Sequence, residues 1–248
     1  MLYAPIAIIA IFSFTEARVL GNWTGFSFQL FENLFQGHTS DMLGSAVWNT
    51  FTIALLASAI STLLGTLAAI GIFDLRGMRK QTILFANNIP ILNADIITGV
   101  ALFLLFITLG FTQGYITVLL AHVSFCTPYV VLSVLPHLKQ MNPNIYEAAL
   151  DLGATPFVAF RRVLMPQIRT GMISGFILAF TLSLDDFAVT LFTKGNSGVE
   201  TLSTYIYADA RKGGLTPELR PLTTLIFLSV LTLLIVINYR ANKQIKNK

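Results

Sequence analysis

Three carboxylates lie within apolar stretches of this chain, where charged side chains are rare. Asp95 lies in the apolar run 82–109, and Asp185 and Asp186 are neighbours in a second run, 171–193. An ionised carboxylate at the centre of a bilayer costs about 2.5–3.5 kcal/mol on insertion scales, so such residues usually have a functional reason to be there. Because no Lys or Arg shares these two runs, the sequence predicts a path that attracts cations.

The two acidic positions are expected at the same depth in a membrane. Lys80 precedes Asp95, and Arg169 precedes Asp185, by nearly the same number of residues. At the helical rise per residue, both carboxylates would lie about 22–24 Å from an inner belt of basic residues. Two helices would therefore bring negative charge to one level in the central to outer membrane.

Neighbouring polar and aromatic residues extend this candidate substrate path. Ser183 shares a helix face with Asp186 at a spacing of three residues, and a hydroxyl beside a carboxylate can hydrogen-bond an ammonium group. Consecutive residues of a helix point about 100° apart, so which of Asp185 and Asp186 faces the path stays open. Phe187 and Phe192 add ring faces that attract cations. The alternative is that the acids are protonated or paired with a cation on a partner subunit.

The sequence contains no recognisable catalytic or metal-binding constellation. The single cysteine, Cys126, excludes an internal disulfide and a multi-cysteine metal site. The three histidines lie in different segments without ligand spacing, and we expect His122 to be a hydrogen-bonded packing residue rather than a proton carrier. A Gly-rich phosphate loop, a nucleophile elbow and an HExxH motif are all absent from the sequence. We therefore expect a protein that is not an enzyme and needs no cofactor.

Composition places the chain in the membrane. Of its 248 residues, 54% are hydrophobic and 11% are charged, and the mean hydropathy is +0.71. A soluble domain would carry about a quarter charged residues. We expect an all-α integral membrane protein in the lipid bilayer, with one transmembrane domain over 1–248. The net charge of +4 follows membrane sidedness and requires no nucleic-acid partner.

About six transmembrane helices are expected. They follow the apolar runs 2–14, 44–73, 82–109, 115–135, 171–193 and 222–239. The first run is shorter than the ~20 residues that a spanning helix needs, so we expect that helix to be truncated. Eleven Lys and Arg residues fall in 74–80, 137–169 and 240–248, against five on the opposite side. The positive-inside rule therefore predicts a multi-pass protein with 137–169 and the C-terminus in the cytoplasm.

A polar loop over residues 142–166 separates two of the apolar runs. The capping and helix-breaking residues of two short helices follow in order along it: Asn142, Pro143, Gly153, Thr155, Pro156 and Pro166. Gly153 supplies the left-handed residue that commonly ends a helix, and Pro166 is expected to end the second helix. Ala148 and Ala149 have small side chains, so another surface can approach the first helix closely. The 142–166 loop is therefore predicted to bind a partner.

The residues of this loop resemble a known motif. Glu147-Ala148-Ala149, three residues, Gly153, nine residues and then Val163-Leu164-Met165-Pro166 resemble the EAA loop in membrane subunits of bacterial ABC importers. In that family the loop is cytoplasmic and docks into a groove on the ATP-hydrolysing subunit. The resemblance implies a type I ABC importer permease with a MetI-like fold in the inner membrane. Its ATPase-coupling residues would be Glu147, Ala148, Ala149, Gly153 and Pro166.

Further segments make the resemblance more specific. These segments are Ala94–Ile96, His122–Pro128, Ser183–Phe187 and Gly214–Glu218. They resemble the C-type membrane subunits of spermidine/putrescine importers, in which acids matching Asp95, Asp185 and Asp186 and a serine matching Ser183 are linked to polyamine passage. The resemblance implies four kinds of partner: a polyamine substrate, a second permease subunit in a heterodimer, a dimer of ATP-binding subunits and an extracytoplasmic substrate-binding protein.

Two alternatives stay open at this point. A permease for thiamine, ferric iron or an aminophosphonate would carry the same loop, since the binding protein largely selects the cargo. A secondary proton-coupled carrier also uses buried aspartates. Such a carrier has no reason to contain the 142–166 loop, and its transport would survive the loss of ATP.

Overall fold

The computed structural model of the chain is helical in all of its described regular elements. It describes residues 4–17, 23–35, 38–142, 144–196, 198–211, 217, 219–225, 227–229, 231–232 and 235. These fall into two compact units, one formed by Met1–Ser45 with Tyr205–Lys248 and the other by Ala46–Thr204. The all-α class is confirmed, whereas one domain over 1–248 stays a prediction. The tail 240–248, Pro143 and part of the expected span 222–239 (226, 230, 233–234 and 236–239) lie outside the described residues.

The described N-terminal part of the first unit contains the short helices α1 (Ala4–Phe12) and α2 (Gln29–Phe35). Between them, Phe14 stacks on Phe26 with ring centroids 5.5 Å apart, and Phe28 and Phe31 pack around the same ring. The carbonyl of Ala17 accepts a hydrogen bond of 2.7 Å from the guanidinium of Arg220. With nine residues, α1 is shorter than a spanning helix, as the run 2–14 predicts.

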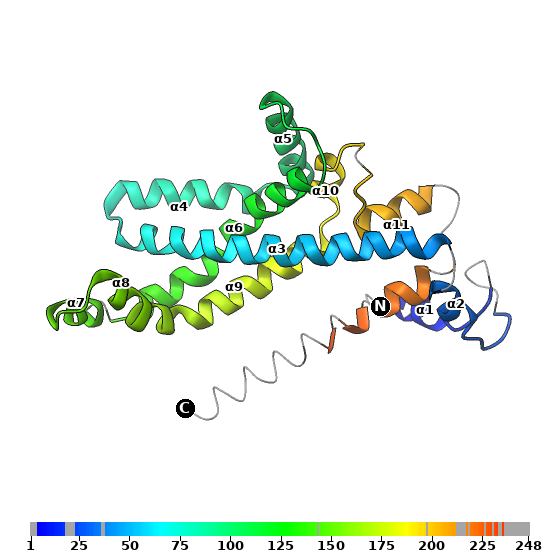
Figure 1. Cartoon of the computed structure of the whole chain (residues 1–248), viewed down its shortest axis with the longest axis horizontal. Helices are drawn as coiled ribbons and strands as arrows, with labels where there is room; N and C mark the ends of the chain where they lie inside the picture. The colour runs from blue at the N-terminus through cyan, green and yellow to red at the C-terminus, as the bar shows by residue number, and fades with distance from the viewer. Residues whose placement is uncertain are drawn as a thin grey trace. The chain divides into compact units, whose positions relative to one another are not determined.

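The second unit contains the long helices (Figure 1). Its elements are α3 (His38–Asp74, from Ala46 on), α4 (Gly77–Leu92), α5 (Asp95–Thr108), α6 (Tyr115–Gln140), α7 (Asn144–Asp151), α8 (Pro156–Ala159), the π-helical turn η1 (Phe160–Leu164), α9 (Met165–Asp185) and α10 (Ala188–Thr193). The last helix, α11 (Leu202–Arg211), begins in this unit and belongs mostly to the first. Among the described residues, the helices over 41–74, 115–140 and 156–185 are long and apolar enough to cross a membrane. The expected spans over 44–73 and 115–135 are thereby confirmed.

The expected continuous helix over 82–109 is wrong, because it is broken in the middle. The first half, α4, ends at Leu92, and α5 starts at Asp95 with its axis bent by 108° (Figure 1). Pro90 in the last turn of α4 has no N–H to donate. Asn93 then adopts an extended backbone conformation with ψ of 147°. Together α4 and α5 are apolar enough to form one broken span.

The expected helix over 171–193 is broken as well. After α9 ends at Asp185, Asp186 is extended with φ of −63° and ψ of 134°, and α10 begins two residues later. Non-helical backbone within a membrane protein is tolerated where protein groups satisfy its hydrogen bonds. Here the side chain of Asp186 accepts the backbone N–H groups of Val189 and Thr190, which α10 cannot satisfy internally.

The core of the second unit lies mainly between α6 and α9. Val130, Val134, Leu138 and Ile168 are fully or almost fully buried there. Gly175 of α9 allows the close approach, because a methyl group at this position would lie 3.1 Å from Cγ1 of Val130. Small residues at such contacts are typical of helix packing in membranes, where tight van der Waals contact is the main attraction.

Replacing Gly175 with Leu is expected to destabilise this contact by about 1–3 kcal/mol, because added methylenes in a tight interface force the helices apart. The measurement is the temperature at which the detergent-solubilised protein aggregates. Gly71→Leu is the matched control, since the space around Gly71 of α3 is open. An equal loss of thermal stability in both variants would contradict the close packing of α6 against α9.

The 142–166 loop folds as the short helix α7 followed by the start of a second helix at Pro156, and four of its five described caps and breakers behave as expected: Asn142, Gly153, Thr155 and Pro156. The side chain of Asn142 accepts the N–H of Asn144 at 3.0 Å. Gly153 adopts the left-handed conformation with φ of +85° and ends α7. Thr155 caps α8 by accepting the N–H of Val158 at 3.4 Å.

Pro166 does not end the second helix, contrary to the prediction. The helix passes from α8 through η1 into α9 as one run, Pro156–Asp185. In the π-helical turn each N–H donates to the carbonyl of the fifth preceding residue instead of the fourth, so the N–H of Met165 bonds to the carbonyl of Phe160. Pro166 follows this shift at the start of α9. The missing N–H of Pro166 is tolerated there because the normal helical ladder is already interrupted.

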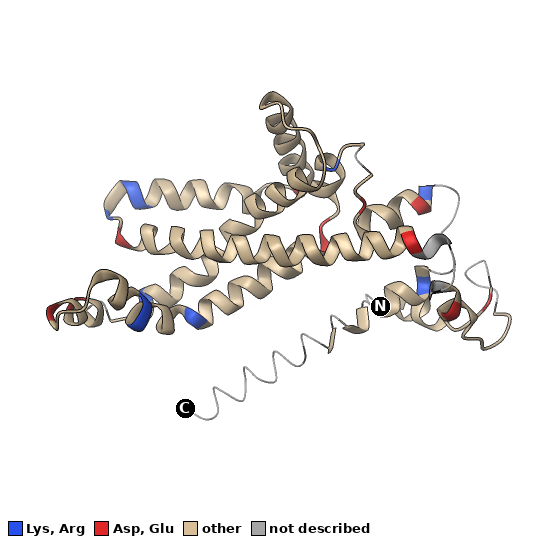
Figure 2. Ribbon diagram, in the orientation of Figure 1, with Lys and Arg blue, Asp and Glu red and all other residues tan. Residues whose placement is uncertain are grey.

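Basic residues of the second unit collect at one end. Figure 2 shows Lys and Arg at the start of α4, in η1 and at the start of α9, the end at which the 142–166 loop lies. Acidic residues lie at that end too, at the end of α3 and in α7, whereas at the two helix breaks Asp95 starts α5 and Asp185 ends α9 in apolar runs that contain no Lys or Arg. A group of basic residues at the loop end is therefore present, while the depth of the acids in a membrane and the side on which the loop lies stay predictions.

Candidate functional site

The two helix breaks meet beside one cavity. Gly99 of α5 brings this helix against α10, since a methyl group on Gly99 would lie 3.2 Å from both the carbonyl oxygen of Ala188 and Cα of Val189. A cavity of about 480 Å³ opens next to this contact. The residues that line it come from α5, α6, α9 and α10: Ala94, Asp95, Ile96, Phe125, Tyr129, Thr181, Leu182, Asp185, Asp186, Phe187 and Ala188.

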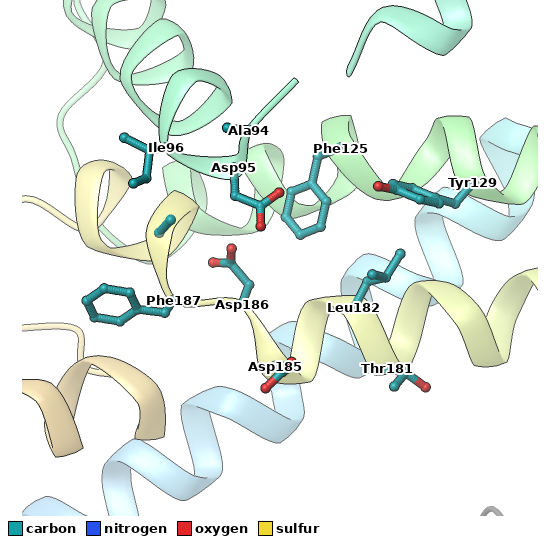
Figure 3. Close-up of a pocket in the computed structure, with 11 residues that line it drawn as sticks. Ala94, Asp95, Ile96, Phe125, Tyr129, Thr181, Leu182, Asp185, Asp186 and Phe187 are labelled. Atoms are coloured by element: carbon teal, nitrogen blue, oxygen red, sulfur yellow. The ribbon is translucent and has the colours of Figure 1, made fainter. Parts of the chain in front are cut away.

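All three predicted acids lie at this cavity, and two of them face each other. Figure 3 shows the carboxylates of Asp95 and Asp186 turned toward one another from the two breaks, whereas Asp185 points away from this pair. The side chain of Asp186 is 5% exposed, and Asp95 and Asp185 are exposed to the cavity and beyond. The facing pair is therefore Asp95 and Asp186.

Local backbone donors stabilise the negative charge of these carboxylates. Asp186 accepts the N–H of Val189 at 3.2 Å, the N–H of Thr190 at 2.8 Å and the hydroxyl of Thr190 at 2.7 Å. Asp95 is the first residue of α5, and an acidic side chain in the first turn of a helix interacts favourably with the helix dipole. At the helix breaks, backbone N–H groups and a helix dipole thus stabilise the negative charge, since the two apolar runs that hold these acids contain no Lys or Arg.

Ser183 and His122 form a buried layer behind the cavity. Ser183 is 3% exposed and is not among the described residues that line the cavity; its hydroxyl lies 2.6 Å from Nδ1 of His122. The other ring nitrogen, Nε2, lies 2.9 Å from Oγ1 of Thr190 and 3.4 Å from Oδ2 of Asp186. The expected hydrogen-bonded histidine is confirmed, and it connects Ser183 with Asp186.

Three aromatic rings line the cavity, and sequence reasoning identified one of them. Phe187 lies at the cavity as expected, whereas Phe192 packs against Gly99. Phe125 and Tyr129 of α6 also line it and were missed. Their spacing of four residues on one helix face was the signal that could have identified them. Carboxylates and aromatic faces are both groups that attract cations.

The described residues provide no site for a metal ion, because no group of three or more His, Cys, Asp or Glu side chains lies close enough together. Cys126 is buried, and its thiol lies 3.5 Å from the carbonyl oxygen of Ala179. The thiol is thus part of the contact between α6 and α9.

The 142–166 loop presents an apolar surface of its own. None of the residues of α7 is buried. Leu152 is 90% exposed and Phe157 is 69% exposed. Glu147 and Ala148 are exposed, and Ala149 is half-buried. Such exposed large apolar side chains, rimmed by polar residues, are typical of a protein interaction site.

Behind α7 a second cavity of about 450 Å³ separates this helix from the body of the unit. Glu147 and Tyr146 line it from α7, and Phe73 and Lys80 line it from the opposite side. The ammonium group of Lys80 donates to the carbonyl of Phe73 at 3.0 Å and lies over its ring. The face of α7 away from this cavity has no buried residue.

Comparison with known proteins identifies relatives along most of the chain. Residues 75–243 match the family described as "Binding-protein-dependent transport system inner membrane component". The chain is 37% identical to the putrescine transport system permease protein PotI of Escherichia coli (strain K12) over 232 residues, 91% of this chain and 81% of the relative. It is 36% identical to the spermidine/putrescine transport system permease protein PotC of Haemophilus influenzae over 235 residues, 95% of this chain and 90% of the relative.

Solved structures share the fold. A chain of the MetNI methionine ABC transporter in an inward-facing conformation superposes with a TM-score of 0.66 at 18% identity, covering 82% of this chain and 95% of that one. A chain of a bacterial alginate ABC transporter, in complex with an alginate-bound periplasmic protein, superposes with a TM-score of 0.70 at 19% identity, covering 96% and 86%. These similarities confirm the MetI-like importer fold expected from the sequence.

Proposed function

Because the chain belongs to the family of binding-protein-dependent transport system inner membrane components, we propose that it is a polyamine permease subunit of an ABC importer. In this proposal the cavity between the two helix breaks is part of the translocation path. The carboxylates of Asp95 and Asp186 bind ammonium groups of the substrate. Asp185 adds negative charge on the exposed side of the path, and Ser183 belongs to the buried layer behind it.

The facing carboxylates are the observation that carries this proposal. Spermidine and putrescine are flexible methylene chains with protonated amines, so they need separated anionic groups and apolar contacts between them. Asp95 and Asp186 supply the anionic groups, and Phe125, Tyr129 and Phe187 supply aromatic faces. The relatives named as putrescine and spermidine/putrescine permeases support the same substrate class.

The 142–166 loop is proposed to couple the path to ATP hydrolysis on a separate subunit. The exposed apolar residues of this loop support docking to a dimer of ATP-binding subunits. Glu147, Ala148 and Ala149 of the exposed helix α7 would belong to the docking segment, Gly153 ends that helix, and Pro166 lies where the loop continues into α9. The basic belt at this end of the second unit supports a cytoplasmic position for the loop (Figure 2). A second permease subunit and an extracytoplasmic binding protein complete the importer, and the C-terminus is cytoplasmic.

Other cargoes fit the cavity less well. An aminophosphonate is anionic at its phosphonate group and would be repelled by Asp95 and Asp186. Ferric iron would need several hard oxygen ligands at once, and the three carboxylates of the cavity are not grouped as a metal site. Thiamine, an aromatic cation, remains the second candidate because Phe125, Tyr129 and Phe187 could stack on its rings.

Uptake into vesicles tests the proposal. The chain is reconstituted with its partner permease, the ATP-binding subunits and the binding protein, and labelled spermidine is offered with ATP inside or outside the vesicle. We expect spermidine uptake to require ATP on the side of the membrane where the 142–166 loop lies. We also expect unlabelled putrescine to reduce this uptake. Uptake that persists without ATP would instead identify a secondary carrier, and uptake of thiamine without polyamine would reassign the cargo.

A further inference from the structure

We propose that His122 is a positioning residue that holds the carboxylate of Asp186 toward Asp95 and thereby sets the affinity of the cavity for its cation. This inference rests on the proposed function, since it assumes that the cavity binds an organic cation. His122 does not line the cavity itself and acts through Asp186.

The ring of His122 joins the two sides of the break between α9 and α10. It projects from α6, is 1% exposed and contacts the side chain of Ser183 before the break and that of Thr190 after it. The two distances are 2.6 Å and 2.9 Å, so both are full hydrogen bonds. One side chain thus fixes the last turn of α9 relative to the first turn of α10, with Asp186 held between them.

The direction of these hydrogen bonds follows from the carboxylate. Ionised Asp186 only accepts, so the hydroxyl proton of Thr190 is donated to Oδ2 of Asp186 at 2.7 Å. Oγ1 of Thr190 must then accept from His122, which places a proton on Nε2 of the imidazole. We take the imidazole as neutral in this proposal, so that Nδ1 accepts the hydroxyl proton of Ser183. A single directed chain of donors therefore runs from Ser183 through His122 and Thr190 to Asp186.

This arrangement restrains Asp186 without cancelling its charge. A neutral imidazole donates a hydrogen bond and contributes no positive charge, so the carboxylate stays available to a cation. Nε2 of His122 also lies 3.4 Å from Oδ2 of Asp186 and adds a second contact on the buried side. The ring of Phe125, which lines the cavity, lies 5.2 Å from the imidazole. His122 therefore supports both an anionic and an aromatic wall of the cavity.

Two substitutions of His122 test the hydrogen bonds of its two ring nitrogens separately. His122→Gln can place an amide N–H near the position of Nε2 and retain the donor to Thr190, whereas His122→Asn reaches only toward Ser183. We expect His122→Asn to raise the spermidine concentration for half-maximal uptake about tenfold, the loss expected when a charged acceptor loses one support. We expect His122→Gln to restore most of that affinity. Thr190→Val, which removes the hydroxyl relay, should act like His122→Asn.

His137→Gln is the matched control, because His137 lies on the same helix and bonds only to the backbone carbonyl of Ser133 in the described structure. The yield of assembled transporter and the maximal uptake rate are measured with each variant. A merely structural role would lower yield or maximal rate and leave the half-saturating concentration unchanged, and this result would overturn the inference.

The double variant with Asp186→Asn separates this inference from the proposed function. If His122 acts through Asp186, His122→Asn adds at most about a twofold loss once Asp186 is neutral, because coupled sites are non-additive. Full additivity would overturn the inference. If Asp186→Asn lowers uptake but His122→Asn and Thr190→Val do not, only the inference fails. If Asp186→Asn leaves uptake unchanged, the proposed function fails.

Discussion

Asp95→Asn and Asp186→Asn are each expected to lower ATP-driven spermidine uptake about tenfold to a hundredfold, because each removes a charged partner of an ammonium group. The two carboxylates face one another across the cavity (Figure 3). Asn keeps the size of the side chain and can still cap a helix, so the helix breaks should persist. Uptake rates at low spermidine concentration, normalised to assembled transporter, give the measurement.

The neighbouring acid provides an internal comparison. Asp185 lines the same cavity but points away from the facing pair, so we expect Asp185→Asn to lose less uptake than Asp186→Asn. Asp41→Asn, an exposed acid in the first turn of α3, serves as a control for the loss of one surface charge. Equal uptake in Asp95→Asn, Asp186→Asn and the control would exclude the two carboxylates from the path.

Leu152→Asp is expected to lower uptake by about thirtyfold or more, because a charge placed at the centre of an apolar contact commonly costs at least about 2 kcal/mol of binding. Leu152 is 90% exposed at the end of α7. The affected step is docking of the ATP-binding subunit, which is measured by co-purification of that subunit with the permease and by ATP hydrolysis in the presence of loaded binding protein.

Met78→Asp is the matched control for this substitution. Met78 is 76% exposed in the first turn of α4, at the same end of the second unit but outside the 142–166 loop. We expect the control to retain the ATP-binding subunit, while Leu152→Asp loses it. Normal co-purification of Leu152→Asp would show that the exposed tip of α7 is not the docking surface.

The acids and the 142–166 loop could be identified from the sequence because their residue types differ from those of the apolar segments around them. Asp95, Asp185 and Asp186 are charges in apolar runs, and Gly153 and Thr155 carry conformational signals that the structure confirms. These are local properties of residue type, and they can be recognised without knowledge of tertiary packing.

Pro90 was a local signal for the break between α4 and α5, but the break after Asp185 could not be predicted, because apolar periodicity does not distinguish one bent span from a straight one. Asp186 was interpreted as a residue on a continuous helix face shared with Ser183. In the structure Asp186 leaves the helix and accepts the N–H groups of the next one, while Ser183 bonds to a histidine from α6. That arrangement depends on α6, α9 and α10 meeting in space, and no local pattern encodes it.

Location of the bound substrate in the assembled transporter is the most direct test of the central claim. A structure is determined with spermidine trapped during transport, in a lipid environment and with all subunits present. We expect amine nitrogens within about 2.7–3.2 Å of the carboxylates of Asp95 and Asp186, a normal hydrogen-bond distance. Spermidine bound elsewhere in the permease, with these two carboxylates turned away from it, would contradict the account.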